Sequence, residues 1–224
     1  FFILSRLVGA TARLYLVISI LQIFIFDRLG IPFELTALVI LILILLYTFE
    51  GGVKTIIYTD TLQTTGMLLG LIICIVVIVK AMGMDFSGAL SLMNEKGYTR
   101  MFNTDVLSGS HFFKQILGGA FIAIAMTGLD QEMMQKNISV KTIKDSQKNI
   151  VSFSVVLVLV NFLFLFLGGI LYLYADSAGI KVAPDDLFPT IALGDTFSGL
   201  IGIIFILALI SALFPSVDGA ITSI

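Results

Sequence analysis

The sequence predicts an all-α protein, a polytopic bundle of transmembrane helices that crosses a lipid bilayer several times. Of its 224 residues, 58% are hydrophobic and 12% are charged, whereas an average soluble domain has about 25% charged residues. The charged residues are also clustered, because four lysines crowd one short interval between two apolar runs. Such clusters are typical of loops between membrane spans. We therefore expect a multi-pass protein of the plasma (inner) membrane, with the lipid bilayer as its surroundings.

Six apolar runs have the composition of membrane helices. A helix needs about 20 apolar residues to cross the hydrocarbon core, and it satisfies its own backbone hydrogen bonds there. The runs are therefore predicted to be helices rather than strands. The predicted spans are residues 1–26, 35–49, 55–79, 112–129, 149–175 and 196–224.

The segments between the spans carry the usual signals of turns and loops. Asp27–Pro32 ends the first span, and Glu50–Lys54, with its two glycines, separates the second from the third. From Met82 to Ser110 the chain is polar and irregular, so we expect a long loop that holds a short helix over Phe86–Met93. A polar outer loop containing Pro184–Pro189 is expected before the sixth span.

Both ends of the sequence indicate a piece of a longer protein. The chain begins with Phe1-Phe2 instead of a start methionine, and Ile221–Ile224 stops inside an apolar run. We therefore expect the six spans to be a fragment of a single transmembrane domain.

The basic residues predict an orientation. By the positive-inside rule, the lysine-rich loop before the fifth span lies in the cytoplasm. Alternation of the spans then places Glu50–Lys54 inside and the loop with Asp185-Asp186 outside. The lysines of the cytoplasmic loop are Lys136, Lys141, Lys144 and Lys148.

The composition argues against several classes of function. The net charge is −2, and there is no basic surface interleaved with aromatic residues, so nucleic acid is not expected as a partner. The single Cys74 offers neither an intrachain disulfide nor a zinc cluster. The sequence contains no Ser/His/Asp set, HExxH motif or phosphate-binding glycine loop. We therefore expect the protein not to be an enzyme.

Asp60 is the clearest ionisable residue inside a predicted span. It follows Lys54 by six residues, which places it about 9 Å inside the membrane if the span begins there. An ionisable group in a span normally faces a functional cavity, so Asp60 is a candidate cation ligand or relay. The alternative is an acid that caps the start of the helix, where the helix dipole favours a negative charge.

The sixth span gathers Ser211, Ala212, Pro215, Ser216 and Asp218 within two helical turns. Because proline has no N–H, Pro215 leaves the carbonyl of Ser211 without its helical donor. A free carbonyl beside hydroxyls and a carboxylate is the all-oxygen environment that sodium prefers. The alternative is a proline kink packed with small residues, which is common in membrane helices.

Arg13 is the candidate ligand for an anionic solute. Arg6 and Arg13 are seven residues apart and share one helix face. The guanidinium of Arg13 can hold a carboxylate through two hydrogen bonds. Alternatively, both arginines extend to the cytoplasmic surface, which is common near the ends of spans.

Three blocks of the sequence resemble signatures of the sodium:solute symporter family, to which sodium/glucose and sodium/proline cotransporters belong. In Tyr47–Gln63, a Gly-Gly turn precedes Tyr-Thr-Asp and a glutamine. Gly128–Lys136 is similar to the family's Gly-x-Asp/Asn-Gln segment ending in Gln-Arg, with lysine in place of arginine. Leu187–Pro189, followed later by Ser211–Asp218, is similar to the family's Phe-Pro and Ala-Ala-x-x-Ser-Thr-x-Asp.

The resemblance implies a LeuT-type fold of two inverted five-helix repeats, with the six spans as core helices three to eight. It also implies sodium ligands on the sixth span, namely the carbonyls of Ala212 and Pro215 and the hydroxyl of Ser216. Asp60 matches a family aspartate on the inner sodium pathway. Pro215 departs from the family's usual serine or threonine, and one hydroxyl ligand is therefore missing.

The resemblance also bears on the solute. Sugar-transporting members carry a Tyr-Trp pair where this chain has Met126 and Thr127, and a lysine where it has Leu157. These differences disfavour a hexose. Ala123, Met126 and Thr127 are expected to face the central cavity, where their small or weakly polar side chains suit a compact, partly apolar solute.

The resemblance predicts a sodium-coupled symporter that moves a small organic solute by alternating access, with sodium as the coupling ion. An alternative is a membrane sensor, in which a module of the same fold is joined to a signalling domain. A membrane-embedded enzyme is a third reading, and it has little support because no nucleophile lies near a base.

Overall fold

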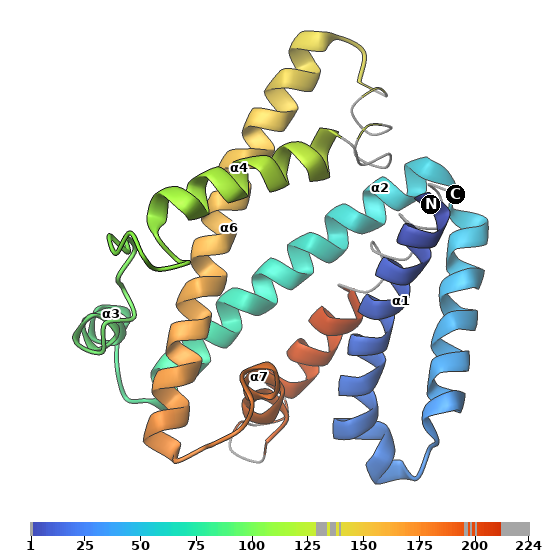
Figure 1. Ribbon diagram of the computed structural model, residues 1–224. Coiled ribbons are helices and arrows are strands. Elements are labelled where there is room, and N and C mark those ends of the chain that lie inside the picture. The colour runs from blue at the N-terminus through green and yellow to red at the C-terminus, as the bar shows by residue number, and fades with distance from the viewer. Residues whose placement is uncertain are drawn as a thin grey trace. The chain divides into compact units, whose positions relative to one another are not determined.

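The computed structural model describes residues 2–128, 140–194 and 201–211, together with residues 134, 138, 197 and 199. For residues 2, 6, 47–60, 126 and 127 it describes the backbone alone. Every element in these ranges is a helix (Figure 1), in agreement with the predicted all-α class. The contacts group the chain into two compact units, Phe1–Met82 with Ile170–Ile224 (unit 1) and Gly83–Gly169 (unit 2), which are described separately.

Unit 1 begins with a helical hairpin. Helix α1 (Phe2–Leu21) continues into a π-helical turn, Gln22–Phe26, and a 3₁₀ turn, Asp27–Leu29. Gly30 then adopts the left-handed conformation, with φ of 68°, which glycine reaches without a steric penalty. These elements match the predicted first span and the turn after it. The hairpin partner of α1 is the start of helix α2 (Phe33–Ala81). Its buried Ile44 packs against Leu14 and Val17 of α1 and against Ile40, one turn earlier in α2.

Between the second and third predicted spans, the structure differs from the expectation. Helix α2 is continuous from Phe33 to Ala81, so the loop expected at Glu50–Lys54 was wrong. Its 49 residues correspond to about 73 Å, more than twice the thickness of a hydrocarbon core. The axis turns sharply in the cyan part of the ribbon (Figure 1). Helix α2 contains the adjacent pair Gly51-Gly52, and glycine pairs are a common cause of a change of direction in a helix.

In the core of unit 1, the later part of α2, which we call its second arm (residues 53–81), packs against elements from the end of the chain. These are the end of α6 (Ile143–Ala178), α7 (Pro184–Leu193) and the helix Ile201–Ser211. Ring pairs connect them, because the centroids of Tyr174 and Phe197 are 5.2 Å apart and those of Phe188 and Phe205 are 4.8 Å apart. The largest fully buried side chains in the described part of this core are Cys74, Ile78, Ile170 and Ile201.

Helix α7 corrects a second expectation, since a polar loop was predicted over Pro184–Pro189. Pro184 stands at the start of the helix, where its missing N–H is not needed. Asp185 and Asp186 lie in the first turn, where the helix dipole favours negative charge. Leu187 and Ile191 are one turn apart on the buried face. The segment is therefore a short amphipathic helix with a polar start.

Unit 2 contains α3 (Phe86–Glu95), α4 (Phe112–Gly128) and the first part of α6. The predicted short helix at Phe86 is confirmed, and the Asp85 carboxylate caps it by accepting a hydrogen bond of 2.7 Å from the Gly88 N–H. Met93 of α3 packs on α6 at Gly169, where a side chain would collide with the Met93 thioether. The rings of Phe86 and Phe166 reinforce this contact at 4.5 Å.

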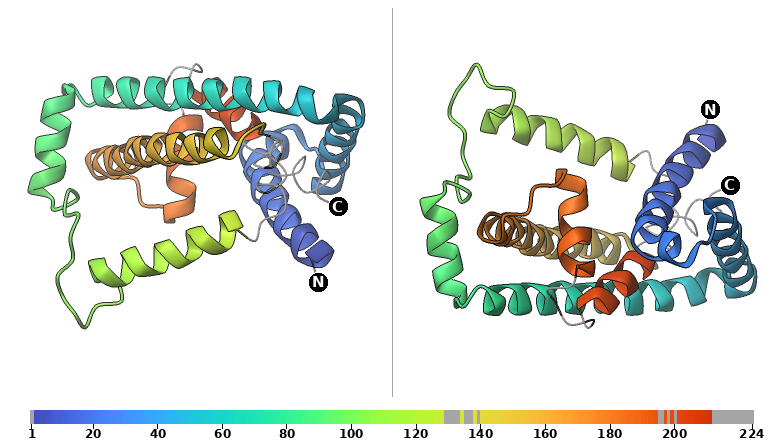
Figure 2. Two further views of the ribbon diagram at one scale, coloured as in Figure 1. Left: turned by 90° about the horizontal axis from the view of Figure 1, so that it is seen from above. Right: turned by 90° about the horizontal axis from the view of Figure 1, so that it is seen from below.

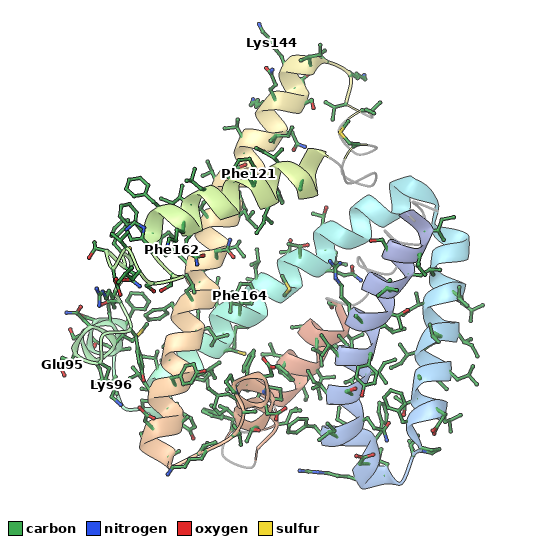
Figure 3. The ribbon with its side chains drawn as sticks, viewed as in Figure 1. Glu95, Lys96, Phe121, Lys144, Phe162 and Phe164 are labelled. Carbon is green, nitrogen blue, oxygen red and sulfur yellow. The ribbon has the colours of Figure 1, made fainter. Side chains whose placement is uncertain are left out.

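The helices have the composition of membrane spans. By length and apolar content, three described helices can cross a bilayer: Ile3–Leu29, Thr61–Ala81 and Ile143–Ala178. Three shorter apolar helices overlap the other predicted spans: Phe33–Leu46, Phe112–Ala125 and Ile201–Ser211. Figure 3 shows Phe121 on α4 and Phe162 and Phe164 on α6, and all three are exposed. Large exposed rings of this kind indicate surfaces that face lipid or another helix.

Candidate functional site

Of the four residues predicted to bind sodium, the structure describes one, and only its backbone. Ala212, Pro215 and Ser216 lie outside the described residues. Asp60 is described by its backbone alone, which is helical and belongs to the second arm of α2. The sodium site therefore stays a prediction, and the structure shows the elements that lead to it.

The residues predicted to contact the solute lie in different units. Ala123 is exposed on α4, and Met126 and Thr127 follow it on the same helix with backbone positions alone. Arg13 is exposed on α1, in unit 1. A shallow groove of about 610 Å³ runs along α1. Its lining is apolar apart from two hydroxyl-bearing residues, so it offers little to orient a polar solute; the lining residues are Leu7, Val8, Thr11, Ala12, Tyr15 and Leu16.

The helix that leads into the predicted sodium ligands packs tightly on α2. The contact is at Gly70, where an added Cβ would lie 2.8 Å from Cγ2 of Ile204. In Figure 1 and in both views of Figure 2, the end of the helix Ile201–Ser211 points toward the cyan part of α2. The two helices therefore run antiparallel, and glycine allows their backbones to approach closely.

One face of α2 connects this contact to Asp60. Gln63 precedes Gly70 by seven residues, and Asp60 precedes Gln63 by three, so the three positions lie near one another around the helix. Gly70 is buried, and Cys74, one turn further on, is 2% exposed. The face of α2 that receives the helix Ile201–Ser211 is therefore the face on which the backbone places Asp60.

Gln63 carries an unusual polar atom on this face. Its side-chain Oε1 is buried and has no hydrogen-bond partner in the described part of the chain. Leaving such an acceptor unpaired costs about 1–3 kcal/mol, and an atom of this kind therefore calls for an explanation. Gln63 was not among the residues predicted to form the site. The available signal was its spacing of three residues from Asp60 within one signature block.

A second polar group, at the α1–α2 hairpin, was also missed. Gln22 is 6% exposed, and its Nε2 donates hydrogen bonds of 2.6 Å to the Asp27 carboxylate and to the Ile31 carbonyl. Its Oε1 accepts a hydrogen bond of 2.8 Å from the Thr36 hydroxyl. Since both ends of the amide are satisfied, this group holds the hairpin together and leaves no free ligand for an ion.

The sequence matches known proteins of one family. The sequence profile of the sodium:solute symporter family matches residues 3–223. The chain belongs to the sodium:solute symporter family. A curated relative of this symporter-family chain is the sodium-coupled monocarboxylate transporter 2 of Bos taurus, which is 26% identical over 191 residues. The match covers 80% of this chain and 30% of that transporter, so the chain spans about a third of its relative's length. No solved structure matches the chain.

The family match covers all three sequence blocks that resemble family signatures. In this symporter-family chain, the first block lies within α2. The second block, Gly128–Lys136, and the end of the third lie mostly outside the described residues. The family match and the apolar helices together indicate a membrane protein of the sodium:solute symporter family.

Proposed function

We propose that the protein is a multi-pass, sodium-coupled symporter of the plasma membrane that carries a small organic solute. The observation that carries this proposal is the family match over residues 3–223, nearly the whole chain. Sodium enters down its electrochemical gradient, and each charge moved contributes about 2.3 kcal/mol per 100 mV of membrane potential. This energy drives the solute inward by alternating access, with no covalent step.

Packing within unit 1 supports the proposed sodium site. The helix α2 and the helix Ile201–Ser211 are antiparallel at the contact between Gly70 and Ile204. Residues that precede Gly70 therefore lie on the same side of this contact as residues that follow Ile204. Asp60 precedes the contact by ten residues, and Ser216 follows it by twelve. If the last span continues as a helix, both residues are about 15–18 Å beyond the contact on the same side. We infer that Asp60, Ala212, Pro215 and Ser216 form one wall of a sodium site.

The LeuT-type architecture is part of the same proposal. It explains why a single span would carry a proline among hydroxyls, since such folds bind ions at interrupted helices near the bilayer midplane. Under this architecture the six spans are core helices three to eight, and the other wall of the site comes from helices that this chain does not include.

Short monocarboxylates are the solute class that we propose to test first. The bovine relative is named for monocarboxylate transport. In this chain, Met126, Thr127 and Leu157 replace the aromatic and cationic residues expected for a sugar. Ala123 beside them leaves room for a compact solute, and Arg13 is a candidate partner for its carboxylate.

The test uses the full-length protein in proteoliposomes. Uptake of labelled monocarboxylates, amino acids and sugars is measured with an inward sodium gradient and with choline in place of sodium. We expect one class to accumulate only with sodium. If uptake of the best solute is the same in choline, sodium coupling is ruled out. If no solute accumulates but a signalling domain follows the membrane part and responds to a solute, the sensor alternative is favoured.

A further inference from the structure

Gln63 bears an oxygen that the proposed sodium site does not yet use. Oε1 is buried without a hydrogen-bond partner among the described residues, although Gln63 as a whole is only half-buried. The other orphaned oxygen, Ser19 Oγ, belongs to a hydroxyl that can rotate toward a carbonyl of its own helix. An amide oxygen only accepts, so Gln63 Oε1 needs a donor or a cation.

The antiparallel packing brings a second set of oxygens to the level of Gln63. Gln63 precedes Gly70 by seven residues, and Ser211 follows Ile204 by seven. Gln63 and Ser211 are therefore each about 10 Å from the Gly70–Ile204 contact along their helix axes, on the same side of it. Seven residues make two turns, so Ser211 also shares the face of Ile204 that meets α2. The two helices lie side by side over this stretch in Figures 1 and 2.

The chemistry of Ser211 complements that of Gln63 around a cation. Ser211 brings a hydroxyl and a backbone carbonyl. Pro215, four residues later, has no N–H and cannot donate to that carbonyl. Carbonyl, hydroxyl and amide oxygens can all act as acceptors. A hard monovalent cation can bind several such oxygens at once, whereas a single hydrogen-bond donor pairs with one. The backbone of Asp60 lies one turn before Gln63 along α2.

We propose that Gln63 Oε1 is an oxygen ligand of the transported sodium ion, acting together with Ser211 at the junction of α2 and the helix Ile201–Ser211. This assignment rests on the proposed sodium coupling, and it gives a ligand role to a residue of α2 to which the family resemblance assigned none. The opposite arrangement, in which the Gln63 –NH₂ donates to a carbonyl of the facing helix, gives Gln63 a purely structural role. The two arrangements predict different responses to substitution.

The experiment measures sodium binding without solute. The full-length protein in detergent is heated at increasing sodium chloride, with choline chloride keeping the ionic strength constant. For Gln63→Leu, we expect the sodium concentration that gives half-maximal thermal stabilisation to rise about tenfold, the usual consequence of losing one polar contact to a charged partner. For Gln63→Glu, which keeps an oxygen at the same place, we expect a change of less than about threefold.

A matched control comes from the exposed side of the same helix. Thr65 is exposed, and its hydroxyl donates to the Thr61 carbonyl of its own turn at 2.8 Å. Thr65→Val is therefore expected to leave the sodium response unchanged. If Gln63→Leu also leaves it unchanged, or if Gln63→Glu weakens it as much as leucine does, the assignment is wrong.

The unfolding midpoint in choline alone separates a ligand from a structural donor. Replacing an unpaired buried acceptor by leucine leaves nothing unsatisfied, so we expect the sodium-free midpoint to stay the same or to rise. A clear fall in that midpoint would show that the amide donates a hydrogen bond and would overturn the assignment. Wild-type protein that is indifferent to sodium, both here and in uptake, would overturn the proposed function itself. A sodium-responsive wild type with an unaffected Gln63→Leu variant would overturn the role of Gln63 alone.

Discussion

At the residue scale, a glutamine in the π-helical turn after α1 and a glutamine on α2 perform different tasks because their surroundings differ. Gln22 has all of its hydrogen bonds satisfied at the end of the α1–α2 hairpin. Gln63 Oε1 has no hydrogen-bond partner among the described residues, and Gln63 lies on the face that receives the helix Ile201–Ser211. A satisfied buried amide stabilises the fold, whereas an unsatisfied one is available to bind a ligand.

Replacing Gln22 by leucine should therefore destabilise the protein. The substitution removes the donors for the Asp27 carboxylate and the Ile31 carbonyl. It also removes the 2.8 Å acceptor of the Thr36 hydroxyl, which keeps only its longer 3.4 Å hydrogen bond to the Pro32 carbonyl. We expect a loss of about 1–3 kcal/mol, measured as a lower thermal midpoint of the full-length protein by circular dichroism.

The partner substitution Thr36→Val tests whether this group acts as a unit. It removes a single hydrogen bond to Gln22. The double variant should be less destabilised than the two single effects added together, because both remove the same contact. Strict additivity, or a Gln22→Leu variant as stable as the wild type, would show that the network does not hold the hairpin.

At the scale of elements, close approach between helices decides which faces meet. Gly70 permits the helix Ile201–Ser211 to touch α2, whereas Gly66, one turn earlier, has open space where a Cβ would be. The same contrast recurs on α6, where Gly169 meets Met93 and the adjacent Gly168 faces nothing within 4 Å. Glycine composition alone does not distinguish these positions, since only the neighbouring helix makes one of each pair indispensable.

The pair on α2 gives a matched test. Gly70→Val places a side chain against Ile204, and we expect about 1–3 kcal/mol of destabilisation and reduced sodium-driven uptake. Gly66→Val makes the same chemical change in open space and should retain both stability and uptake. Similar losses in the two variants, measured by thermal unfolding and proteoliposome uptake, would contradict the packing described here.

The start of α6 depends on a capping interaction. The Asp145 N–H donates to the Thr142 hydroxyl at 3.1 Å, and that hydroxyl donates to the Asp145 carboxylate at 2.7 Å. Thr142→Ala should lower stability by about 1 kcal/mol. In Ser154→Ala the lost hydroxyl bonds only to the Ile150 carbonyl within the same helix, and the thermal midpoint should hardly change. Equal effects of the two substitutions would argue against a capping role.

At the scale of the whole molecule, the proposed transport cycle depends on residues from two distant parts of the sequence. Asp60 belongs to α2, and Ser216 follows the helix Ile201–Ser211. Neither part can bind sodium well alone, because a hard cation takes several oxygen ligands at once. The antiparallel contact at Gly70 is what brings the two parts into one unit.

Two substitutions test this combination in the full-length protein. Ser216→Ala removes a hydroxyl oxygen, and Asp60→Asn removes a negative charge. Each should raise the sodium concentration for half-maximal uptake severalfold, because each weakens sodium binding more than solute binding. Asp105→Asn, in an exposed loop of unit 2, is the control and should leave the sodium dependence as in the wild type. Unchanged sodium dependence in both site variants would remove these residues from the ion path.

The predicted elements were recovered where the sequence signal is a long apolar run, and they were missed where the signal is short. All six apolar helices lie within or next to the predicted spans. Two loops turned out to be helical, at Glu50–Lys54 and Pro184–Pro189, because glycine pairs and an initial proline are compatible with a helix when the neighbouring turns continue it. Residue types alone do not decide between a break and a bend.

The sequence by itself determined that this protein is an all-helical membrane protein of the symporter family, because hydrophobic length and signature residues are local properties of the chain. It also singled out Asp60 and the serines beside Pro215. Only the tertiary structure paired Gly70 with Ile204 and showed Gln63 with an unsatisfied oxygen on the same face. Gly70 and Ile204 are more than a hundred residues apart in the sequence. Which helix faces meet is decided by packing in three dimensions, so a local sequence pattern does not identify the partner helix.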